Sequence, residues 1–544
     1  MDFSETRRTR ERMKKTCTIT ALAFVLASLF WAKSSLAASA VPTVSTTAGL
    51  LRGVSEGGVD RFMGVPFAIP PTGPQRWMPA APPDAWHGIR DARIGHEGCV
   101  ADLSADGPAR DNEDCLYLNV WRPAGALENA HLPVVVFFHG GGNTSGETDI
   151  YDGARMARAA HAIVVMPAYR YGIMGFLALP DGPDGSLALG DQIAALKWAQ
   201  ANAARFGGDP AHVLLAGESA GAADVCDLLV SPGARGLFQA SIMQSTFCRP
   251  RPTLETAQAM GRMVAHEVGC DDPGTALRCL RSKPVSALKT AWDRVWTTSE
   301  IALPDKSRVP RPLFPVTPVG SALLPRAPMA AIAAGDIAPG PVVIGYDEDE
   351  LRGFFAGMYP MSSDRFAAII ARDYGPIRQD LDRLYPTAGR EPLYVLAAIR
   401  SDQMIICPSY QFADAVSKIR PTAMYEFGDR RAPPFRSLAL SLPRPPGFDG
   451  GASHTSELPY LFGYRARSRN LTPEQDILAD RMAQVWVSLV HEPGRWPPYD
   501  ARTHAVLWIS LPGDHSIGPR TTRYAAHHCD FWAQHTDIPN RLFP

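Results

Sequence analysis

The stretch Gly217-Glu218-Ser219-Ala220-Gly221 lies between an apolar run and a helix-forming run. Residues 212–216 follow a Gly-Gly-Asp-Pro turn signal and predict a short buried strand. Residues 222–230 are compatible with a helix. A serine in a tight turn from strand to helix is held above the sheet edge, with its hydroxyl at the helix N-terminus. The pattern alone is a weak signal, because 46 of the 544 residues are glycine, so a catalytic reading depends on what else the chain supplies.

The composition is that of a globular chain with a large core. Hydrophobic residues make up 46% of the sequence, and the formal net charge is -1. This balance gives no electrostatic reason to expect a nucleic acid or an anionic membrane as a partner. No internal repeat, low-complexity tract or linker divides residues 41–544, so we expect one large domain there.

The first forty residues have the order of a secretory signal peptide. Basic residues at 7–15 precede an apolar run at 17–31, and small residues follow at 35–40. The apolar run is shorter than the roughly 20 residues that a spanning helix needs. This favours a cleaved signal over an uncleaved anchor. We therefore expect a secreted or periplasmic protein with no stable membrane insertion after cleavage.

The rest of the chain alternates apolar strand-like runs with helical stretches, which predicts an α/β protein with a mostly parallel sheet and helices on both faces. A helix is expected at 191–204, and large helical insertions at about 252–340 and 358–420. Besides 212–216, the expected strands are 49–54, 61–67, 116–121, 133–138, 162–166, 240–244 and 341–344.

A glycine triplet, Gly140-Gly141-Gly142, follows the buried strand 133–138 and His139. Glycines at a strand end let the backbone approach a tetrahedral oxygen without interference from Cβ. Ligands of such sheets bind beyond the carboxyl ends of the strands, where Ser219 is also expected. The N–H groups of Gly141, Gly142 and Ala220 are therefore the candidate donors of an oxyanion hole.

Several blocks resemble the type-B carboxylesterases, the cholinesterase-like and para-nitrobenzyl esterase-like branch of the α/β-hydrolase fold. The resemblance runs from about Val44 to Trp532 and implies that fold. The blocks that carry it include Phe62-Met63-Gly64-Val65-Pro66-Phe67-Ala68, Glu113-Asp114-Cys115-Leu116-Tyr117-Leu118-Asn119-Val120, His139-Gly140-Gly141-Gly142, Gly217-Glu218-Ser219-Ala220-Gly221 and Trp496-Pro497-Pro498-Tyr499.

The resemblance implies a catalytic triad in the order Ser219, Glu350, His454. His454 matches the family's histidine in a Gly-rich segment, and Glu350 matches its Gly-x-x-x-Asp-Glu block. Because Glu350 ends a run of four acidic residues, Glu348 or Asp349 is the acid if the register differs.

The resemblance also implies supporting residues around the triad. Glu218 and Glu457 are expected near the histidine as additional carboxylates. Ser245 either forms a hydrogen bond there or is a plain buried serine. Buried ion pairs are expected between Arg76 and Glu113 and between Arg170 and Asp191.

Eight cysteines remain once Cys17 leaves with the signal, and none has the C-x-x-C spacing of a metal or redox site, so no metal is assigned. The resemblance implies the pairs Cys99 with Cys115, Cys270 with Cys279, and Cys407 with Cys529. Cys226 and Cys248 form either a fourth bridge or two buried thiols.

Three departures from the family pattern bear on the pocket. Asn143 replaces the usual aromatic residue after the glycine triplet, and Leu351 replaces the glycine after the acid. Asn143-Thr144-Ser145 is also formally a glycosylation sequon, although a glycan there would obstruct the site. The loop from Cys99 to Cys115 contains no tryptophan, so we do not expect a quaternary ammonium substrate.

These observations predict a cofactor-free serine hydrolase that cleaves small-molecule carboxylic esters through an acyl-enzyme. The alternatives are an amide or carbamate hydrolase on the same fold, and a non-catalytic cholinesterase-like binding protein. The sequence sets neither the acyl and alcohol preference nor the oligomeric state.

Overall fold

The computed structural model describes residues 41–101, 110–246, 248, 250–435, 444–464, 471–511 and 517–539. The expected signal peptide, residues 1–40, lies outside the described residues. Contacts divide the chain into Met1–Pro42 and Thr43–Pro544, and all elements named below belong to the second unit. The interpretation of that unit as one domain with two insertions stays a prediction.

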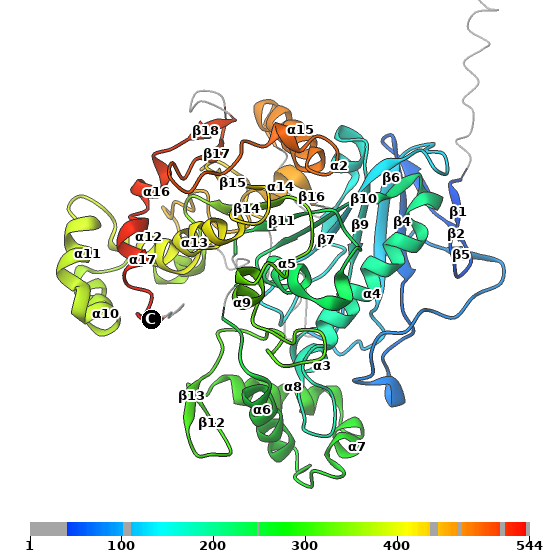
Figure 1. Cartoon of the computed structure of the whole chain (residues 1–544), viewed down its shortest axis with the longest axis horizontal. Helices are drawn as coiled ribbons and strands as arrows, with labels where there is room; N and C mark the ends of the chain where they lie inside the picture. Colours follow the sequence, from blue (N-terminus) through cyan, green and yellow to red (C-terminus); the bar gives the residue numbers. More distant parts are fainter. Residues whose placement is uncertain are drawn as a thin grey trace, which may run out of the picture. The chain divides into compact units, whose positions relative to one another are not determined.

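An 11-stranded sheet forms the centre of the second unit (Figure 1). In the spatial order given below, the strands from β17 (Val506–Ile509) through to β9 (Ile163–Pro167) run parallel, whereas the first strand, β18, and the last three, β6, β4 and β3, are antiparallel to their neighbours. The predicted mostly parallel α/β sheet is confirmed. In spatial order the strands are β18 (Gly518–Arg520), β17 (Val506–Ile509), β15 (Thr422–Phe427), β14 (Val342–Asp347), β11 (Ala240–Gln244), β10 (Gly208–Glu218), β7 (Leu132–Phe138), β9 (Ile163–Pro167), β6 (Tyr117–Pro123), β4 (Val59–Pro66) and β3 (Val54–Glu56).

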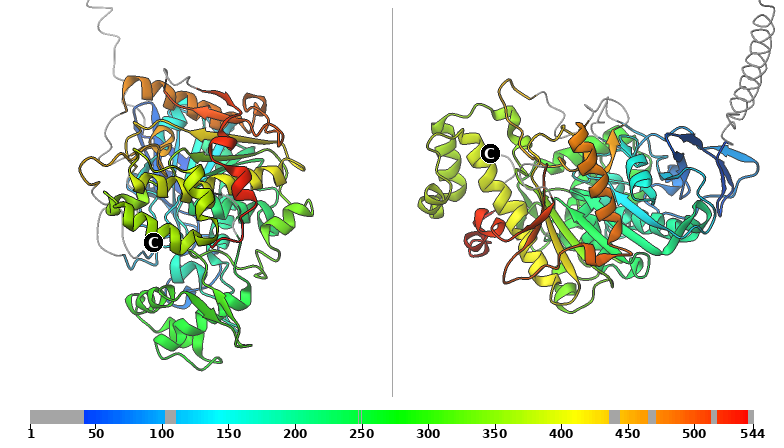
Figure 2. Two further views of the ribbon diagram at one scale, coloured as in Figure 1. Left: turned by 90° about the vertical axis from the view of Figure 1, so that its left-hand side faces the viewer. Right: turned by 90° about the horizontal axis from the view of Figure 1, so that it is seen from above.

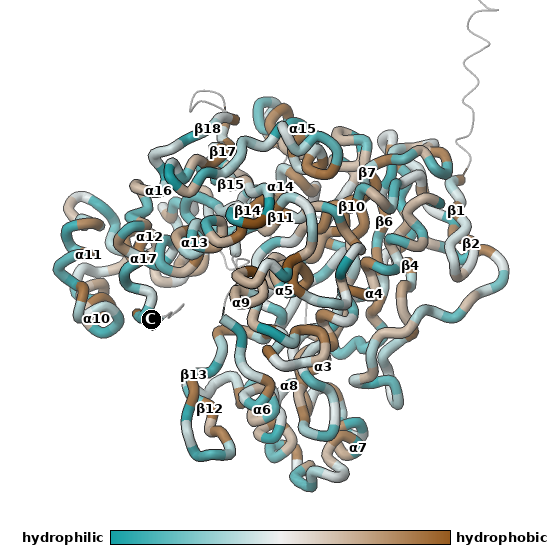
Figure 3. The backbone as a smooth tube through the Cα atoms, viewed as in Figure 1, coloured by the Kyte–Doolittle hydropathy of each residue, from teal (hydrophilic) through white to brown (hydrophobic). Residues whose placement is uncertain are grey.

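Helices cover both faces of this sheet, and β7 shows why its sequence is apolar throughout. Val134 and Val136 pack on the face covered by α4 (Leu187–Asn202) and α5 (Ala220–Val230). Val135 and Phe137 pack on the opposite face with α2 (Ala154–Ala159) and α15 (Pro473–Ser488). The orange helix α15 crosses this second face in Figure 2. Much of the tube along the central strands is brown in Figure 3, as burial on both faces requires.

Two long connections carry most of the remaining helices. Between β11 and β14 lie α6 (Leu254–Glu267), α7 (Ala276–Arg281), α8 (Val285–Trp296), the small ribbon β12 (Glu300–Ala302) with β13 (Arg308–Pro310), and α9 (Pro328–Ala333). Between β14 and β15 lie α10 (Ser363–Tyr374), α11 (Arg378–Leu384), α12 (Pro392–Ser401) and α13 (Cys407–Val416).

The expected single strand at 49–54 is wrong. The structure has two strands there: β2 (Leu50–Arg52) pairs with β1 (Thr43–Ser45) and β5 (Ile89–Asp91), whereas β3 joins the large sheet. The break falls at Gly53, where a Cβ atom would lie 2.3 Å from the carbonyl oxygen of Arg61. The chain can pass this close to β4 only because the residue has no side chain.

Four disulfides cross-link the described residues. Cys99–Cys115, Cys270–Cys279 and Cys407–Cys529 are the pairs that the family resemblance implied. A fourth bridge joins Cys226 on α5 to Cys248 after β11, which answers the question that the sequence left open. Among the helices that the structure describes, none is both long and apolar enough to cross a membrane.

The ion pair between Arg170 and Asp191 gives a test of the fold. The guanidinium donates from Nε and Nη2 to the carboxylate at 2.8 and 2.7 Å, and the two side chains are 3% and 0% exposed. Arg170→Met leaves a buried carboxylate without its partner, and we expect the free energy of unfolding to fall by about 3–5 kcal/mol. Urea denaturation measures this loss.

The matched control is Arg495→Met, because Arg495 pairs with Glu492 at the surface, where the two side chains are 53% and 55% exposed. Its urea midpoint should stay close to that of the unchanged protein, since exposed pairs contribute little. Equal midpoints for the two variants would contradict the buried pairing of Arg170.

Candidate active site

Ser219 occupies a strained turn between β10 and α5. Its backbone has φ 56° and ψ -119°, a conformation that residues with a side chain rarely adopt. Its N–H donates to the carbonyl oxygen of Gln244 at 2.9 Å, which fixes the turn against the end of β11. The side chain is partly buried, while its neighbours Glu218 and Ala220 are almost fully buried. The predicted strand-turn-helix setting is therefore present around this serine.

The glycines beside Ser219 are required by close backbone contacts. A Cβ atom at Gly221 would lie 2.2 Å from the carbonyl oxygen of Phe138, and one at Gly217 would lie 2.6 Å from that of Gly221. A Cβ atom at Gly140 would lie 2.9 Å from Cβ of Ser219. The loop after β7 therefore passes directly against the serine turn.

The candidate oxyanion residues lie in these same two segments. Gly141 and Gly142 continue the loop after β7 with φ values of 122° and 65°, which glycine adopts without strain. Ala220 is the first residue of α5, so its N–H has no acceptor within the helix. Ala220 is thus adjacent to Ser219 in the chain, and Gly141 and Gly142 continue the loop in which Gly140 lies against Ser219.

His454 and Glu350 are in direct contact although they are 104 residues apart. The Nδ1 atom of the imidazole lies 2.6 Å from Oε2 of Glu350, and the N–H of His454 donates to the carbonyl oxygen of Glu350 at 2.9 Å. The other carboxylate oxygen accepts from the N–H of Asp347 at 3.0 Å. Glu350 is fully buried and His454 is 6% exposed, so the pair is held away from bulk water.

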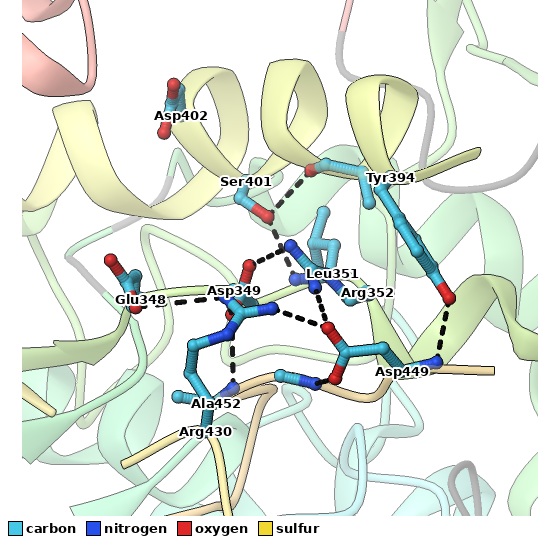
Figure 4. A network of polar contacts seen from close by, with 12 residues as sticks. Glu348, Asp349, Leu351, Arg352, Tyr394, Ser401, Asp402, Arg430, Asp449 and Ala452 are labelled. Atoms are coloured by element: carbon cyan, nitrogen blue, oxygen red, sulfur yellow. Dashed lines mark hydrogen bonds and ion pairs between the residues drawn. The ribbon is translucent and has the colours of Figure 1, made fainter. Parts of the chain in front are cut away.

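Glu348 and Asp349, the alternative acids, have other partners. Asp349 pairs with Arg352 and Arg430 and accepts from the N–H of Ala452 at 3.1 Å (Figure 4). Glu348 accepts from Arg523 at 2.9 Å. Of the three carboxylates, Glu350 is the one in contact with His454.

The network in Figure 4 ties the turn of Asp349, Leu351 and Arg352 to the segment from Asp449 to Ala452 and to Tyr394 and Ser401 on α12. Arg352 and Arg430 both reach Asp449, at 3.1 and 2.6 Å. The N–H of Asp449 donates to the Tyr394 hydroxyl at 2.7 Å, and the N–H of Leu351 donates to the Ser401 hydroxyl at 2.9 Å. Leu351, which replaces the family's glycine, is buried in this network.

A second carboxylate, that of Glu218, faces the histidine from the serine side. Oε1 of Glu218 lies 3.1 Å from Nε2 of His454. Burial alone lowers the pKa of His454, but the negative charges of Glu218 and Glu350 outweigh it and raise the pKa to about 9. The pKa of Glu218 itself is raised, because burial disfavours its charged form. The two carboxylates therefore favour a positive charge on the imidazole, whereas the burial of Glu218 favours its own neutral form.

Two further carboxyl groups form a pair behind Glu350. Glu457 accepts from Gln244 at 2.8 Å, and the pKa of Asp347 is raised well above its usual range by burial and by the charges of Glu457 and Glu350. Burial and the charge of Glu350 also raise the pKa of Glu457, so this group of carboxyl side chains favours protonation more than exposed carboxyl groups do. The sequence analysis named Glu457 but missed Asp347. Its position at the end of β14, where ligands of a parallel sheet bind, could have indicated a place near the site.

Ser245 follows β11 with φ 57°, and its N–H donates to the carbonyl oxygen of Gly345 at 2.8 Å. Its hydroxyl is buried and has no hydrogen-bond partner among the described residues. The described part of the chain also has no cluster of three or more histidine, cysteine, aspartate or glutamate side chains suited to a metal ion.

Comparison with known proteins identifies the family. The sequence model of the carboxylesterase family matches residues 40–532. Rabbit (Oryctolagus cuniculus) cocaine esterase is 30% identical over 93% of this chain and 97% of its own. Acetylcholinesterase of Bungarus fasciatus is 33% identical over 84% of this chain and 81% of its own.

A solved structure named PNB esterase has the same fold. It superposes with a TM-score of 0.71 at 28% identity, covering 89% of this chain and 98% of its own. The expected α/β-hydrolase fold is thereby confirmed. The chain belongs to the carboxylesterase family and is a carboxylic ester hydrolase.

Proposed function

We propose that this protein hydrolyses small-molecule carboxylic esters through an acyl-enzyme formed on Ser219, with His454 as general base and Glu350 as the acid that orients it. The observation that carries the proposal is the 2.6 Å contact between His454 and Glu350 beside the strained serine turn. A nucleophile, a base and an orienting acid are the minimum set for this chemistry.

In the first half-reaction the Ser219 oxygen attacks the ester carbonyl and its proton passes to Nε2 of His454. The tetrahedral intermediate collapses when the imidazolium returns this proton to the departing alkoxide, which leaves as the alcohol. In the second half-reaction His454 takes a proton from water, the hydroxide attacks the acyl carbonyl, and Ser219 recovers its proton as the carboxylic acid departs.

The N–H groups of Gly141, Gly142 and Ala220 are the proposed donors to the oxyanion. Each such donor is worth on the order of a hundredfold or more in rate. Glu350, with Glu218 nearby, stabilises the imidazolium that forms in both half-reactions. No cofactor takes part in these steps.

The proposal includes a cellular location, and two alternative functions are weighed against it. The four disulfides fit an oxidising compartment, in agreement with the proposed secretion or export to the periplasm. An amide or carbamate hydrolase on this fold is distinguished by comparing matched ester and anilide substrates. A non-catalytic binding protein is disfavoured because Ser219, Glu350 and His454 are all present.

Reaction with a fluorophosphonate tests the nucleophile. We expect one label per chain in the unchanged protein and none in Ser219→Ala, because the probe bonds to an activated serine oxygen. Intact-protein mass spectrometry measures the label, and circular dichroism verifies that the variant is folded. A folded, unchanged protein that takes up no label would remove the proposal.

The acid is tested by a matched pair of neighbours. Glu350→Gln should lower kcat by about 10³–10⁴-fold, because the amide no longer holds the imidazole in the required tautomer. Glu348→Gln removes the same charge two residues away, where the partner is Arg523, and should stay within a few-fold of the unchanged protein. Similar losses in the two variants would reject Glu350 as the orienting acid.

The charge of Glu218 predicts a shift in the pH profile. His454 must be neutral to accept the serine proton, so kcat/KM rises as pH passes upward through its pKa. Glu218→Gln removes a negative charge that raises this pKa. The acidic limb of kcat/KM against pH should therefore move to lower pH, by about 1 unit or more. Glu348→Gln is again the control, with an unmoved limb, and an unmoved limb in Glu218→Gln would contradict the assignment.

A further inference from the structure

Asn143 is a buried polar residue that the hydrolytic steps do not use. It directly follows the glycine triplet, has φ 55° and is 0% exposed. Asparagine adopts this left-handed conformation more readily than most residues. An amide this deeply buried must find hydrogen-bond partners within the protein.

The Asn143 amide group has a nearly complete set of partners. Its Nδ2 donates to Oδ1 of Asp224 at 3.0 Å and to the carbonyl oxygen of Pro315 at 3.1 Å. The Tyr169 hydroxyl lies 3.2 Å from its Oδ1, and its backbone oxygen accepts from the N–H of Gly172 at 2.7 Å. Both amide hydrogens are thus engaged, which leaves no accessible nitrogen for a glycan at the Asn143-Thr144-Ser145 sequon.

Asp224 lies on α5, the helix that begins directly after Ser219. It is 2% exposed, and its second oxygen accepts from Gln192 on α4 at 2.7 Å. The hydrogen bond from Asn143 therefore links the loop of Gly141 and Gly142 to the helix that carries the nucleophile. The glycines themselves have no side chains with which to make such a link.

We propose that Asn143 and Asp224 are positioning residues that hold the Gly141–Gly142 loop in register with Ser219, so that its N–H groups meet the oxyanion. This inference rests on the proposed ester hydrolysis. A loop of three glycines has many accessible conformations, and a fixed point at its end narrows them further than its backbone contacts alone. A displacement of about 1 Å in such a site is sufficient to lower a rate by on the order of 10²-fold.

The first experiment compares two buried asparagines. Asn143→Leu removes the link at similar volume, whereas Asn202→Leu removes an equally buried amide that bonds to Thr47 and Trp198. Fluorophosphonate titration counts active sites, so rates are expressed per site. We expect Asn143→Leu to lower kcat/KM by about 10–100-fold, mainly through kcat, with KM changed by less than about threefold. Asn202→Leu should lower the melting temperature and leave kcat/KM per site unchanged.

The affinity of an inhibitor that binds the oxyanion hole provides a measurement that a general loss of stability does not change. A trifluoromethyl ketone forms a hemiketal with Ser219 whose oxyanion occupies the same hole. In Asn143→Leu its affinity should weaken by the same factor as kcat/KM, while the affinity for the product alcohol stays within about twofold.

The second experiment uses isosteric variants that avoid a large change in packing. Asn143→Asp places a carboxylate against Asp224. It should lower kcat/KM at least tenfold, because misplacing one N–H donor of the oxyanion hole weakens transition-state binding. Combining it with Asp224→Asn should recover most of this loss, because the amide introduced at position 224 donates to the carboxylate introduced at position 143.

The outcomes separate the two levels of the proposal. Ester hydrolysis by the unchanged protein with kcat/KM of Asn143→Leu within twofold per site would overturn the positioning role alone. So would a double variant no faster than Asn143→Asp, which also decides the case if Asn143→Leu fails to fold. Loss of ester hydrolysis and labelling in the unchanged protein would overturn the proposed function.

Discussion

The site depends on a close backbone approach that leaves no room for side chains. The parallel register pairs Gly217 with Phe138, so β10 and β7 end at the same level of the sheet. A Cβ atom at Gly221 would then lie 2.2 Å from the Phe138 oxygen, and one at Gly140 would lie 2.9 Å from Cβ of Ser219. Glycine at these positions is a steric requirement, and it fixes the separation between the serine turn and the loop of donor groups. His454 lies against this turn through Glu218, and Glu350 contacts the other side of its imidazole.

The second constraint is electrostatic. His454 is nearly buried, and burial by itself disfavours its charged form. Two carboxylates, Glu350 at Nδ1 and Glu218 at Nε2, reverse this preference. The arrangement favours the imidazolium that the proposed reaction needs, but it also holds a proton on the resting base. Burial and the charge of Glu350 raise the pKa of both Asp347 and Glu457, which limits the negative charge around the histidine.

The central strands could be predicted because short continuous apolar runs bounded by turn residues are typical of strands buried on both faces. Strand β17 is also a continuous apolar run but is short, and it was missed. Strand β15 could not be predicted in this way. In β15, Glu426 interrupts the apolar pattern, yet it is buried because Arg523 and His527, about 100 residues later, pair with it. In the site, the residues alone did not separate Glu350 from Glu348 and Asp349. Their roles differ through partners such as Arg430, which is 81 residues from Asp349, and no local pattern contains that information.

The departure from the family pattern at Asn143 is explained by the residues that hydrogen bond to it. Where the family has an aromatic residue, Asn143 brings an amide into a fully buried position, and an amide without acceptors there costs about 1–3 kcal/mol. Asp224 on α5 and the carbonyl oxygen of Pro315 supply the acceptors. Asp224 in turn keeps a second donor in Gln192. Without Asp224 and the Pro315 carbonyl oxygen, the amide of Asn143 would be buried with no acceptor for its hydrogens. The contacts of a buried polar residue, more than its identity, determine what it contributes to this site.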